Sequence, residues 1–419
     1  MRALRLLHHI ALTYLPVSFW RKRLTHVTHD TSHDTAEKQL LIDVSAIAKI
    51  DAKTGIQRVV RNLYKALLAA PPAGYRICPV AASRTQPYRY LPTDFLQQPA
   101  TAPTLPIQVN AGDIFLGLDL SAHLIPHHLE QLWNWKLQGT RISIVIYDLL
   151  PVLHPEWFTP RASRNFHRWL RAIALLADNT IAISRTVQAD FHDWMQKHYQ
   201  LSTTEIPCAT IPLGAELDNN ASITPLPRHL AEHDFILMVG TIEPRKGYDD
   251  ALDAFESLWA TGDSTRLIIV GKQGWDIEEL SHRLRTHAET GKRLIWLNDV
   301  EDNLLSALYR QCLGVLITSK GEGYGLPLIE AAYFRKPVLA RDLSVFREIA
   351  SKNVSFFHSA SDHDLTTLLP QWLKRFKSEN KYIQQPTELT WQVSCLALTQ
   401  ALCYPSPSVG VAPQKIPNL

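Results

Sequence analysis

The sequence predicts an α/β protein built from two doubly wound, Rossmann-like domains. Short apolar runs rich in β-branched residues alternate with amphipathic helical patterns, which is typical of parallel sheets covered by helices. The alternation is interrupted at residues 217–233, a polar stretch with two prolines. Such composition is common in domain linkers. The alternation then starts again, so the chain is expected to contain two domains of similar design.

Composition limits the class of protein. A chain of 419 residues is long enough for two or three domains. The formal net charge is only +3, which gives no electrostatic reason to expect nucleic-acid binding. The five cysteines are scattered and odd in number, which argues against a disulfide framework or a zinc site and favours a reducing compartment.

Residues 1–39 form a basic leader. An apolar run over 6–20 is flanked by arginines and a lysine, and no acidic residue precedes Asp30. The run is too short and too interrupted for a transmembrane helix, which needs roughly 20 apolar residues, and no signal-peptide cleavage site follows it. Two interpretations stay open: an amphipathic segment on an anionic membrane face, and a disordered or loosely packed leader.

The first Rossmann-like domain is expected over residues 40–216. Its strands are predicted by apolar runs at 40–44, 75–80, 113–117, 141–147 and 180–183. Gly55 opens a helix, Asp148 directly follows one strand, and Ser184 follows another. Ligands of open parallel sheets bind outside the carboxyl ends of the strands. We therefore expect Gly55, Asp148 and Ser184 at a cleft or acceptor site, with turn capping as the alternative for Asp148.

Two other patterns could suggest a metal. His123, His127 and His128 lack carboxylate or cysteine partners at ligand spacing, which favours ordinary helix-surface histidines. Asp362-His363-Asp364 is a single Asp-x-Asp before an apolar helix, where helix capping is the favoured role. No metal site is therefore expected.

The second domain is expected over residues 234–388. Its strands are predicted at 235–240, 266–270, 294–297, 315–318 and 336–340. Arg245 and Lys246 follow the first of these strands and precede a helix. Two cations at a helix N-terminus on the ligand side of a sheet favour a diphosphate, with a surface basic pair as the alternative.

A glycine-rich loop follows the strand at 315–318. Gly321, Gly323 and Gly325 allow a ligand to approach the backbone, and the helix after them presents free N–H groups. Glu322 lies in the loop and Glu330 two turns into the helix. Two carboxylates in this arrangement suit a polyhydroxylated ligand such as a nucleotide sugar; the alternative is a structural loop with a solvated glutamate.

Residues 321–330 resemble the Glu-x7-Glu motif of family four retaining glycosyltransferases of GT-B fold, and residues 239–247 are similar to the phosphate-binding segment of that family. The resemblance covers roughly residues 40–400. It implies two domains facing a central cleft, a last helix at 389–404 that crosses back onto the first domain, and a tail at 405–419.

The resemblance also implies site residues. The donor-binding set would be Gly240, Thr241, Arg245, Lys246, Glu322, Gly323, Tyr324, Gly325, Leu326 and Glu330. Within it, Arg245 and Lys246 would bind the diphosphate, Glu322 the sugar and Glu330 the ribose. Asp148, Arg245, Lys246 and Glu322 would be catalytic. Two departures stand out: Tyr147 replaces the usual His before Asp148, and Thr241 replaces the usual Arg.

The expected function is transfer of a sugar, with mannose preferred, from a nucleoside diphosphate sugar to a glycan or lipid-linked glycan in polysaccharide or lipopolysaccharide (O-antigen) biosynthesis. No metal, cofactor or nucleic acid is expected. The expected location is the cytoplasm, with the inner membrane face as a peripheral site. The alternative is a catalytically inactive nucleotide-sugar-binding scaffold of an assembly complex. A phosphorylase is disfavoured, because no lysine site for pyridoxal phosphate is recognisable.

Overall fold

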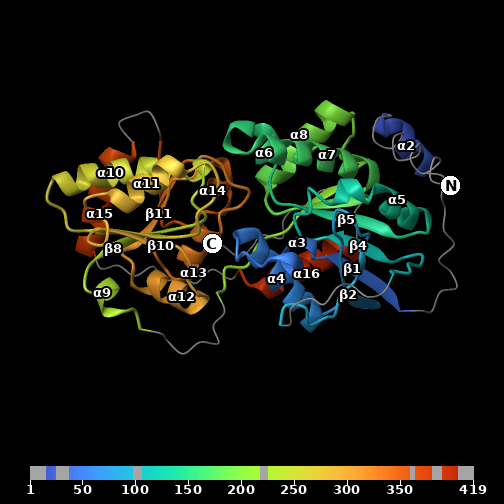
Figure 1. Cartoon of the computed structure of the whole chain (residues 1–419), viewed down its shortest axis with the longest axis horizontal. Helices are drawn as coiled ribbons and strands as arrows, with labels where there is room; N and C mark the ends of the chain where they lie inside the picture. Colours follow the sequence, from blue (N-terminus) through green and yellow to red (C-terminus); the bar gives the residue numbers. More distant parts are fainter. Residues whose placement is uncertain are drawn as a thin grey trace. The chain divides into compact units, whose positions relative to one another are not determined.

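The computed structural model describes residues 16–24, 37–97, 106–217, 225–358, 364–379 and 389–403. They form two compact units (Figure 1). Unit 1 runs through Pro212 and resumes at Trp391, and unit 2 lies between them, Leu213–Thr390. The boundary precedes the expected linker because Ala215 donates its N–H to Leu389 O at 3.0 Å, within unit 2.

Unit 1 contains a seven-stranded sheet in the order β3-β2-β1-β4-β5-β6-β7. Its strands are β1 (Lys38–Asp43), β2 (Tyr75–Ala81), β3 (Arg89–Tyr90), β4 (Ile114–Gly117), β5 (Arg141–Ile146), β6 (Asn179–Ala182) and β7 (Cys208–Thr210). All neighbouring strands are parallel except β2 and β3. The five strands expected from sequence are present, and the two edge strands β3 and β7 were not predicted.

The helices of unit 1 begin where the sequence supplies caps. In α4, the Thr54 hydroxyl accepts the N–H of Gln57, and the Gln57 side chain pairs with the N–H of Thr54, a capping box. The α-helices are α2 (Val17–Leu24), α3 (Ser45–Lys49), α4 (Gly55–Ala69), α5 (Leu129–Leu137), α6 (Leu150–Leu153), α7 (Pro160–Leu176), α8 (Arg185–Tyr199) and α16 (Trp391–Cys403); η1 (Ile125–His127) and η2 (Pro155–Trp157) are single 3₁₀ turns. The late helix α16 packs against the early helix α4.

Helix α2 comes from the basic leader and packs on unit 1. Val17 and Trp20 are buried. The Trp20 ring meets Trp133 edge to face with 5.3 Å between centroids, and Arg21 Nη1 donates to Ala174 O at 2.8 Å. The apolar side of α2 therefore faces protein; residues 1–15 and 25–36 lie outside the described residues. No helix in the described ranges is long and apolar enough to span a membrane.

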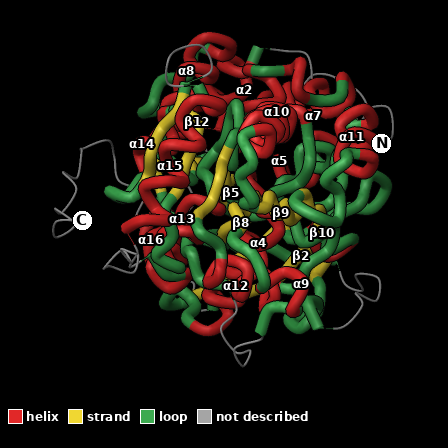
Figure 2. Tube along the Cα trace, turned by 90° about the vertical axis from the view of Figure 1, so that its left-hand side faces the viewer, coloured by secondary structure: helices red, strands yellow, loops and turns green. Residues whose placement is uncertain are grey.

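Unit 2 contains a six-stranded, all-parallel sheet in the order β10-β9-β8-β11-β12-β13. The strands are β8 (Phe235–Val239), β9 (Arg266–Val270), β10 (Leu294–Leu297), β11 (Gly314–Ile317), β12 (Val338–Arg341) and β13 (Val354–Phe357). This is the order of a doubly wound sheet. Successive strands are added on one side from β8 to β10, and the next strand, β11, lies on the other side of β8. Figure 2 shows the strands among their covering helices. The prediction of two doubly wound α/β domains is confirmed.

The helices of unit 2 cover the sheet and bury continuous apolar strands. They are α9 (Arg228–Ala231), η3 (Pro244–Lys246), α10 (Tyr248–Ala260), α11 (Glu278–Thr286), α12 (Asp302–Gln311), α13 (Leu326–Tyr333), α14 (Ser344–Ile349) and α15 (Leu365–Glu379). Alternate residues of β8, Ile236 and Met238, join a core cluster with residues of α10 and α15. The short helix α9 lies within the expected linker, so that stretch is not wholly irregular.

Candidate functional site

The candidate site lies where the winding of the unit 2 sheet reverses. Strands β8 and β11 are neighbours and parallel, with Val315 opposite Leu237. Their carboxyl ends therefore share one edge, and both predicted motifs leave the sheet there. Such a switch point is where doubly wound sheets bind ligands.

The two motif loops are joined by a backbone hydrogen bond and a side-chain hydrogen bond. Lys320 donates its N–H to Arg245 O at 2.7 Å, and the Thr318 hydroxyl donates to Lys246 O at 2.7 Å. Gly247 ends the first loop with φ +65°, and a Cβ there would lie 2.5 Å from Thr318 O. Glycine is required by both the left-handed backbone and the close approach.

Glu322 joins the two predicted cations. Its Oε2 accepts from Arg245 Nη1 at 2.9 Å, and its Oε1 accepts from Lys246 Nζ at 2.5 Å and from Ser319 Oγ at 2.7 Å. Burial alone would raise the pKa of Glu322, but Lys246 and Arg245 outweigh it and lower that pKa to about 2. Glu322 is therefore a carboxylate that neutralises part of the cationic pair in this structure.

A second carboxylate, Glu243, was missed by the sequence analysis. Its Oε1 lies 2.7 Å from Arg245 Nε, and its side chain is only 4% exposed. Arg245 is thus held between Glu243 and Glu322, and it also donates through Nη1 to Gly321 O at 2.7 Å. Two cations and two carboxylates form one balanced cluster. Nothing in the local sequence distinguishes Glu243, because only the fold decides where its side chain points.

The remaining predicted donor residues surround this cluster in different ways. Glu330 is buried on α13 and accepts from the Tyr309 hydroxyl at 2.6 Å. Tyr324 is buried, and its hydroxyl accepts the N–H of Leu213 at 3.0 Å. Gly325 precedes α13 with φ +111°, and a Cβ there would lie 2.6 Å from Phe346 Cε1.

Four other predicted positions lie in the same two loops or next to them. Gly323 is buried between Glu322 and Tyr324, and Leu326 begins α13. At the end of β8, Gly240 O accepts from the Tyr248 hydroxyl at 2.6 Å, and Thr241 is half-buried.

The predicted acceptor residues lie in unit 1 and take part in local capping. Asp148 Oδ1 accepts the N–H of Leu150 at 3.1 Å, and Ser184 Oγ accepts the N–H of Val187 at 3.1 Å as the N-cap of α8. Gly55 is the exposed first residue of α4. These contacts match the capping alternative for Asp148, while a role toward an acceptor stays a prediction.

Tyr147, which stands in place of the usual His, is a core residue. It is 3% exposed, and its hydroxyl donates to Leu118 O at 2.7 Å. Burial raises its pKa well above the ordinary value. The Tyr147 side chain is thus fixed in the interior of unit 1 and is not presented at its surface.

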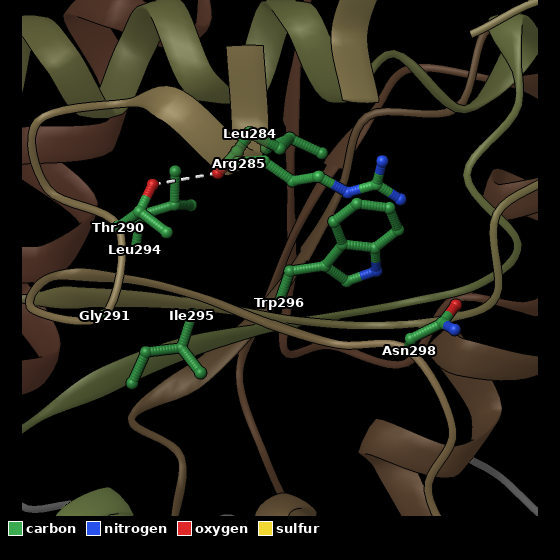
Figure 3. A pocket seen from close by; sticks show the side chains of 8 residues that line it. All are labelled: Leu284, Arg285, Thr290, Gly291, Leu294, Ile295, Trp296 and Asn298. Carbon is green, nitrogen blue, oxygen red and sulfur yellow. Dashed lines mark hydrogen bonds between the residues drawn. The ribbon is translucent and has the colours of Figure 1, made fainter. Parts of the chain in front are cut away.

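A separate pocket of about 370 Å³ lies beside the edge strand β10 (Figure 3). Its lining residues are Leu284, Arg285, Thr290, Gly291, Leu294, Ile295, Trp296 and Asn298. The Arg285 guanidinium stacks over Trp296, 5.2 Å from the ring centre, and Trp296 Nε1 donates to Gly271 O at 2.8 Å. None of the predicted site residues lines this pocket.

The side chains that could bind a metal ion are dispersed in the described parts of the chain. Across the described parts of the chain, no three His, Cys, Asp or Glu side chains gather so as to hold a metal ion. Asp364 Oδ1 accepts the N–H of Thr367 at 2.7 Å, which is the predicted capping role; Asp362 and His363 lie outside the described residues.

His128 is buried, with Nε2 2.6 Å from Ser83 O, so the expectation of a surface histidine was wrong there. All five cysteines are free thiols.

Comparisons with known proteins show what the sequence and the fold are similar to. Residues 227–388 match the family described as "Glycosyl transferases group 1". The chain is 35% identical over 379 residues to the serotype-specific mannosyltransferase WbdA of Escherichia coli, covering 87% of this chain and 46% of WbdA. It is 22% identical over 248 residues to the O-antigen chain mannosyltransferase RfbU of Salmonella typhimurium, covering 58% of this chain and 64% of RfbU.

The fold is also shared with a solved structure. WaaG, a glycosyltransferase involved in lipopolysaccharide biosynthesis, superposes with a TM-score of 0.56 over 87% of this chain and 100% of its own, at 16% identity. The chain spans about half the length of the WbdA relatives it matches. Residues 227–388 are thus a glycosyltransferase group 1 domain, and the chain shares the two-domain GT-B fold of WaaG.

Proposed function

We propose that this chain is a retaining glycosyltransferase that moves a mannosyl group from a nucleoside diphosphate mannose to a glycan or lipid-linked glycan acceptor of O-antigen type. WbdA and RfbU are both mannosyltransferases, which supports mannose as the sugar, and RfbU acts on the O-antigen chain, which supports an O-antigen product. The five free cysteines support action in the cytoplasm, and a lipid-linked acceptor would bring the chain to the inner membrane face.

The observation that carries the proposal is the cluster of Arg245, Lys246 and Glu322 at the switch point. A guanidinium and an ammonium held side by side are suited to a diphosphate. When the donor binds, its phosphate oxygens take over the contacts that Glu322 now makes. The freed carboxylate then accepts hydrogen bonds from sugar hydroxyls, and Glu330 takes the ribose.

In the proposed reaction the bond between the anomeric carbon and the diphosphate oxygen breaks while the acceptor oxygen attacks from the same face. The proton of the acceptor hydroxyl passes to the departing phosphate, which leaves as the nucleoside diphosphate. Arg245 and Lys246 stabilise the charge that develops on this leaving group. Asp148 orients the acceptor, and no metal or cofactor is required.

The test is transfer from a panel of labelled GDP and UDP sugars to matched glycan acceptors. We expect GDP-mannose to be used. Glu322→Ala and Arg245→Ala should each reduce transfer by about 10²–10³-fold, the usual cost of losing a preorganised electrostatic contact. The matched control is Arg228→Ala, which removes an arginine of 93% exposure from the same unit. Unchanged transfer in both site variants would overturn the proposal, and donor binding without turnover would support a scaffold.

A further inference from the structure

Four exposed basic side chains of unit 1 have no role in the proposed reaction. Lys49 ends α3, Arg84 follows β2, His123 follows β4 and Arg161 lies in the first turn of α7. Helix α3 itself follows β1. Strands β2, β1 and β4 are adjacent and parallel, so the segments that carry Lys49, Arg84 and His123 leave the sheet at the same edge.

Hydrogen bonds join these segments into one surface. The bonds are Ala82 N–H to Ser45 Oγ at 2.9 Å, Ile47 N–H to Asp119 Oδ2 at 2.7 Å, and the contact of His128 Nε2 with Ser83 O at 2.6 Å. They tie the loop after β2 to α3 and to the segment after β4. Helix α7, which carries Arg161, packs against η1 in that same segment. The four side chains are therefore held on a common framework.

The charges of this surface act on one another. The pKa of His123 is lowered, first by partial burial of its ring and then by the charges of Lys49, Arg84, Arg161 and His127. Lys49, Arg84 and Arg161 form no ion pair with any residue that the structure describes. Cations gathered without a carboxylate partner attract anions and raise their local concentration.

We propose that Lys49, Arg84, His123 and Arg161 form a binding site for a phosphate or diphosphate group. Two arginine forks can each meet phosphate oxygens in pairs, and a lysine adds a point charge. The neutral imidazole of His123 donates one further hydrogen bond. A soluble phosphate ester and a lipid headgroup both carry this chemistry. The proposal does not rest on sugar transfer, and its test does not use it.

The experiment follows the His123 ring of the full chain by NMR after labelling histidine with ¹⁵N, with the resonance assigned from His123→Gln. Inorganic pyrophosphate is added at low ionic strength, because salt screens exposed charges. We expect the pKa of His123 to rise by about 1 unit, the usual effect of a nearby opposite charge. Pyrophosphate bound in unit 2 does not disturb this reading, because the probe is His123 itself.

Two matched variants decide whether the surface is responsible. The rise in the pKa of His123 should be abolished in the triple variant Lys49→Gln/Arg84→Gln/Arg161→Gln. A control variant loses the same charge from exposed positions elsewhere, Arg168→Gln/Lys197→Gln/Lys374→Gln, and the pKa of His123 should still rise in it. A rise of equal size in both variants would overturn the proposal, because the response would then reflect net charge alone.

Vesicles separate the two sources of phosphate. The full chain and both variants are sedimented with phosphatidylcholine vesicles, with and without phosphatidylglycerol. Binding that needs phosphatidylglycerol and is lost only in the Lys49/Arg84/Arg161 variant supports a lipid headgroup, whereas a His123 response to pyrophosphate without such binding supports a soluble phosphate ester. Failure of both responses in the wild-type chain would overturn the proposal.

Discussion

Lys246 Nζ lies 2.5 Å from Glu322 Oε1, and both side chains are almost shielded from solvent, at 13% and 10% exposure. In the proposed function, a donor phosphate oxygen would take the place of this carboxylate at the ammonium. Glu322 would then compete with the donor for Lys246, and donor binding should be sensitive to changes at this one carboxylate.

Glu322→Gln should separate stability from ligand affinity. Removing one carboxylate from a buried ion pair leaves charge poorly compensated and costs about 3–5 kcal/mol of unfolding free energy. The released cations should bind GDP more readily, so GDP should raise the melting temperature of the variant more than that of the wild type. Differential scanning fluorimetry with and without GDP measures both effects. Equal GDP shifts in the two proteins would contradict the competition.

The control for this variant is Glu232→Gln. Glu232 pairs with Arg228 at 2.8 Å on an exposed helix of the same unit. Exposed ion pairs contribute little to stability. The substitution should leave both the melting temperature and the GDP shift close to wild-type values.

The fold was largely predictable because continuous apolar strands indicate parallel sheets buried on both faces. Edge strands carry a weaker pattern, which explains why β3, β7 and β13 were missed: β3 has two residues, and β13 is mostly half-buried. The cations and Glu322 were predicted because each motif follows a strand. The contacts of Glu243 and of Glu330 with Tyr309 depend on how loops and helices meet, which local sequence does not encode.

The ion pairs that Glu322 makes with Arg245 and Lys246 should be lost at acid pH. The pKa of Glu322 in the folded chain is about 2, against an ordinary value of 4.5. Because its pKa is lower in the folded chain, the ionised Glu322 stabilises the fold. This stabilisation is complete above the pKa of the unfolded chain and is lost as the pH falls through the pKa of the folded chain. The difference between the two pKa values corresponds to about 3 kcal/mol of unfolding free energy. The gap in melting temperature between wild type and Glu322→Gln should therefore narrow between about pH 5 and about pH 2. Parallel profiles would contradict this assignment.

Asp119 should have the opposite pH dependence. Burial and then the charge of Asp43 raise its pKa to about 7. Because the pKa of Asp119 is higher in the folded chain, its protonated carboxyl stabilises the fold. This stabilisation is fully present below 3.8, the ordinary pKa expected in the unfolded chain, and is lost as the pH rises through about 7. Asp119→Asn cannot ionise, so its melting temperature relative to wild type should rise between about pH 4 and about pH 8. A constant difference across this range would show that Asp119 does not titrate there.

Two glycines of unit 2 form a matched pair for a backbone test. Gly247 and Gly262 both have positive φ, but a Cβ on Gly247 would lie 2.5 Å from Thr318 O, while a Cβ on Gly262 would have no atom within 4 Å. Gly262→Ala should cost about 1–2 kcal/mol for the left-handed backbone alone. Gly247→Ala should cost about 1–3 kcal/mol more from the clash and should weaken GDP binding. Chemical denaturation of the two variants measures the difference, and equal losses would contradict the close approach.

The leader helix offers a neighbouring pair of aromatic residues. Trp20 is 6% exposed and packs on Trp133, whereas Phe19 is 43% exposed. Trp20→Ala should destabilise the chain by about 3–5 kcal/mol, the usual cost of truncating a buried aromatic side chain. Phe19→Ala should have a much smaller effect in the same thermal melt. Similar losses for both would mean that α2 is not anchored through Trp20.

The packing of α16 against α4 has a consequence for biosynthesis. The side chains that α16 buries in unit 1 are Trp391, Ser394, Cys395, Leu398 and Leu402. Since a ribosome makes the chain from its amino end, these residues emerge only after all of unit 2 has been made. Unit 1 is thus the first to start folding and the last to be completed. Until then, the surface that α16 will cover is open to chaperones, and translation that stops within unit 2 leaves a nascent chain with this surface uncovered.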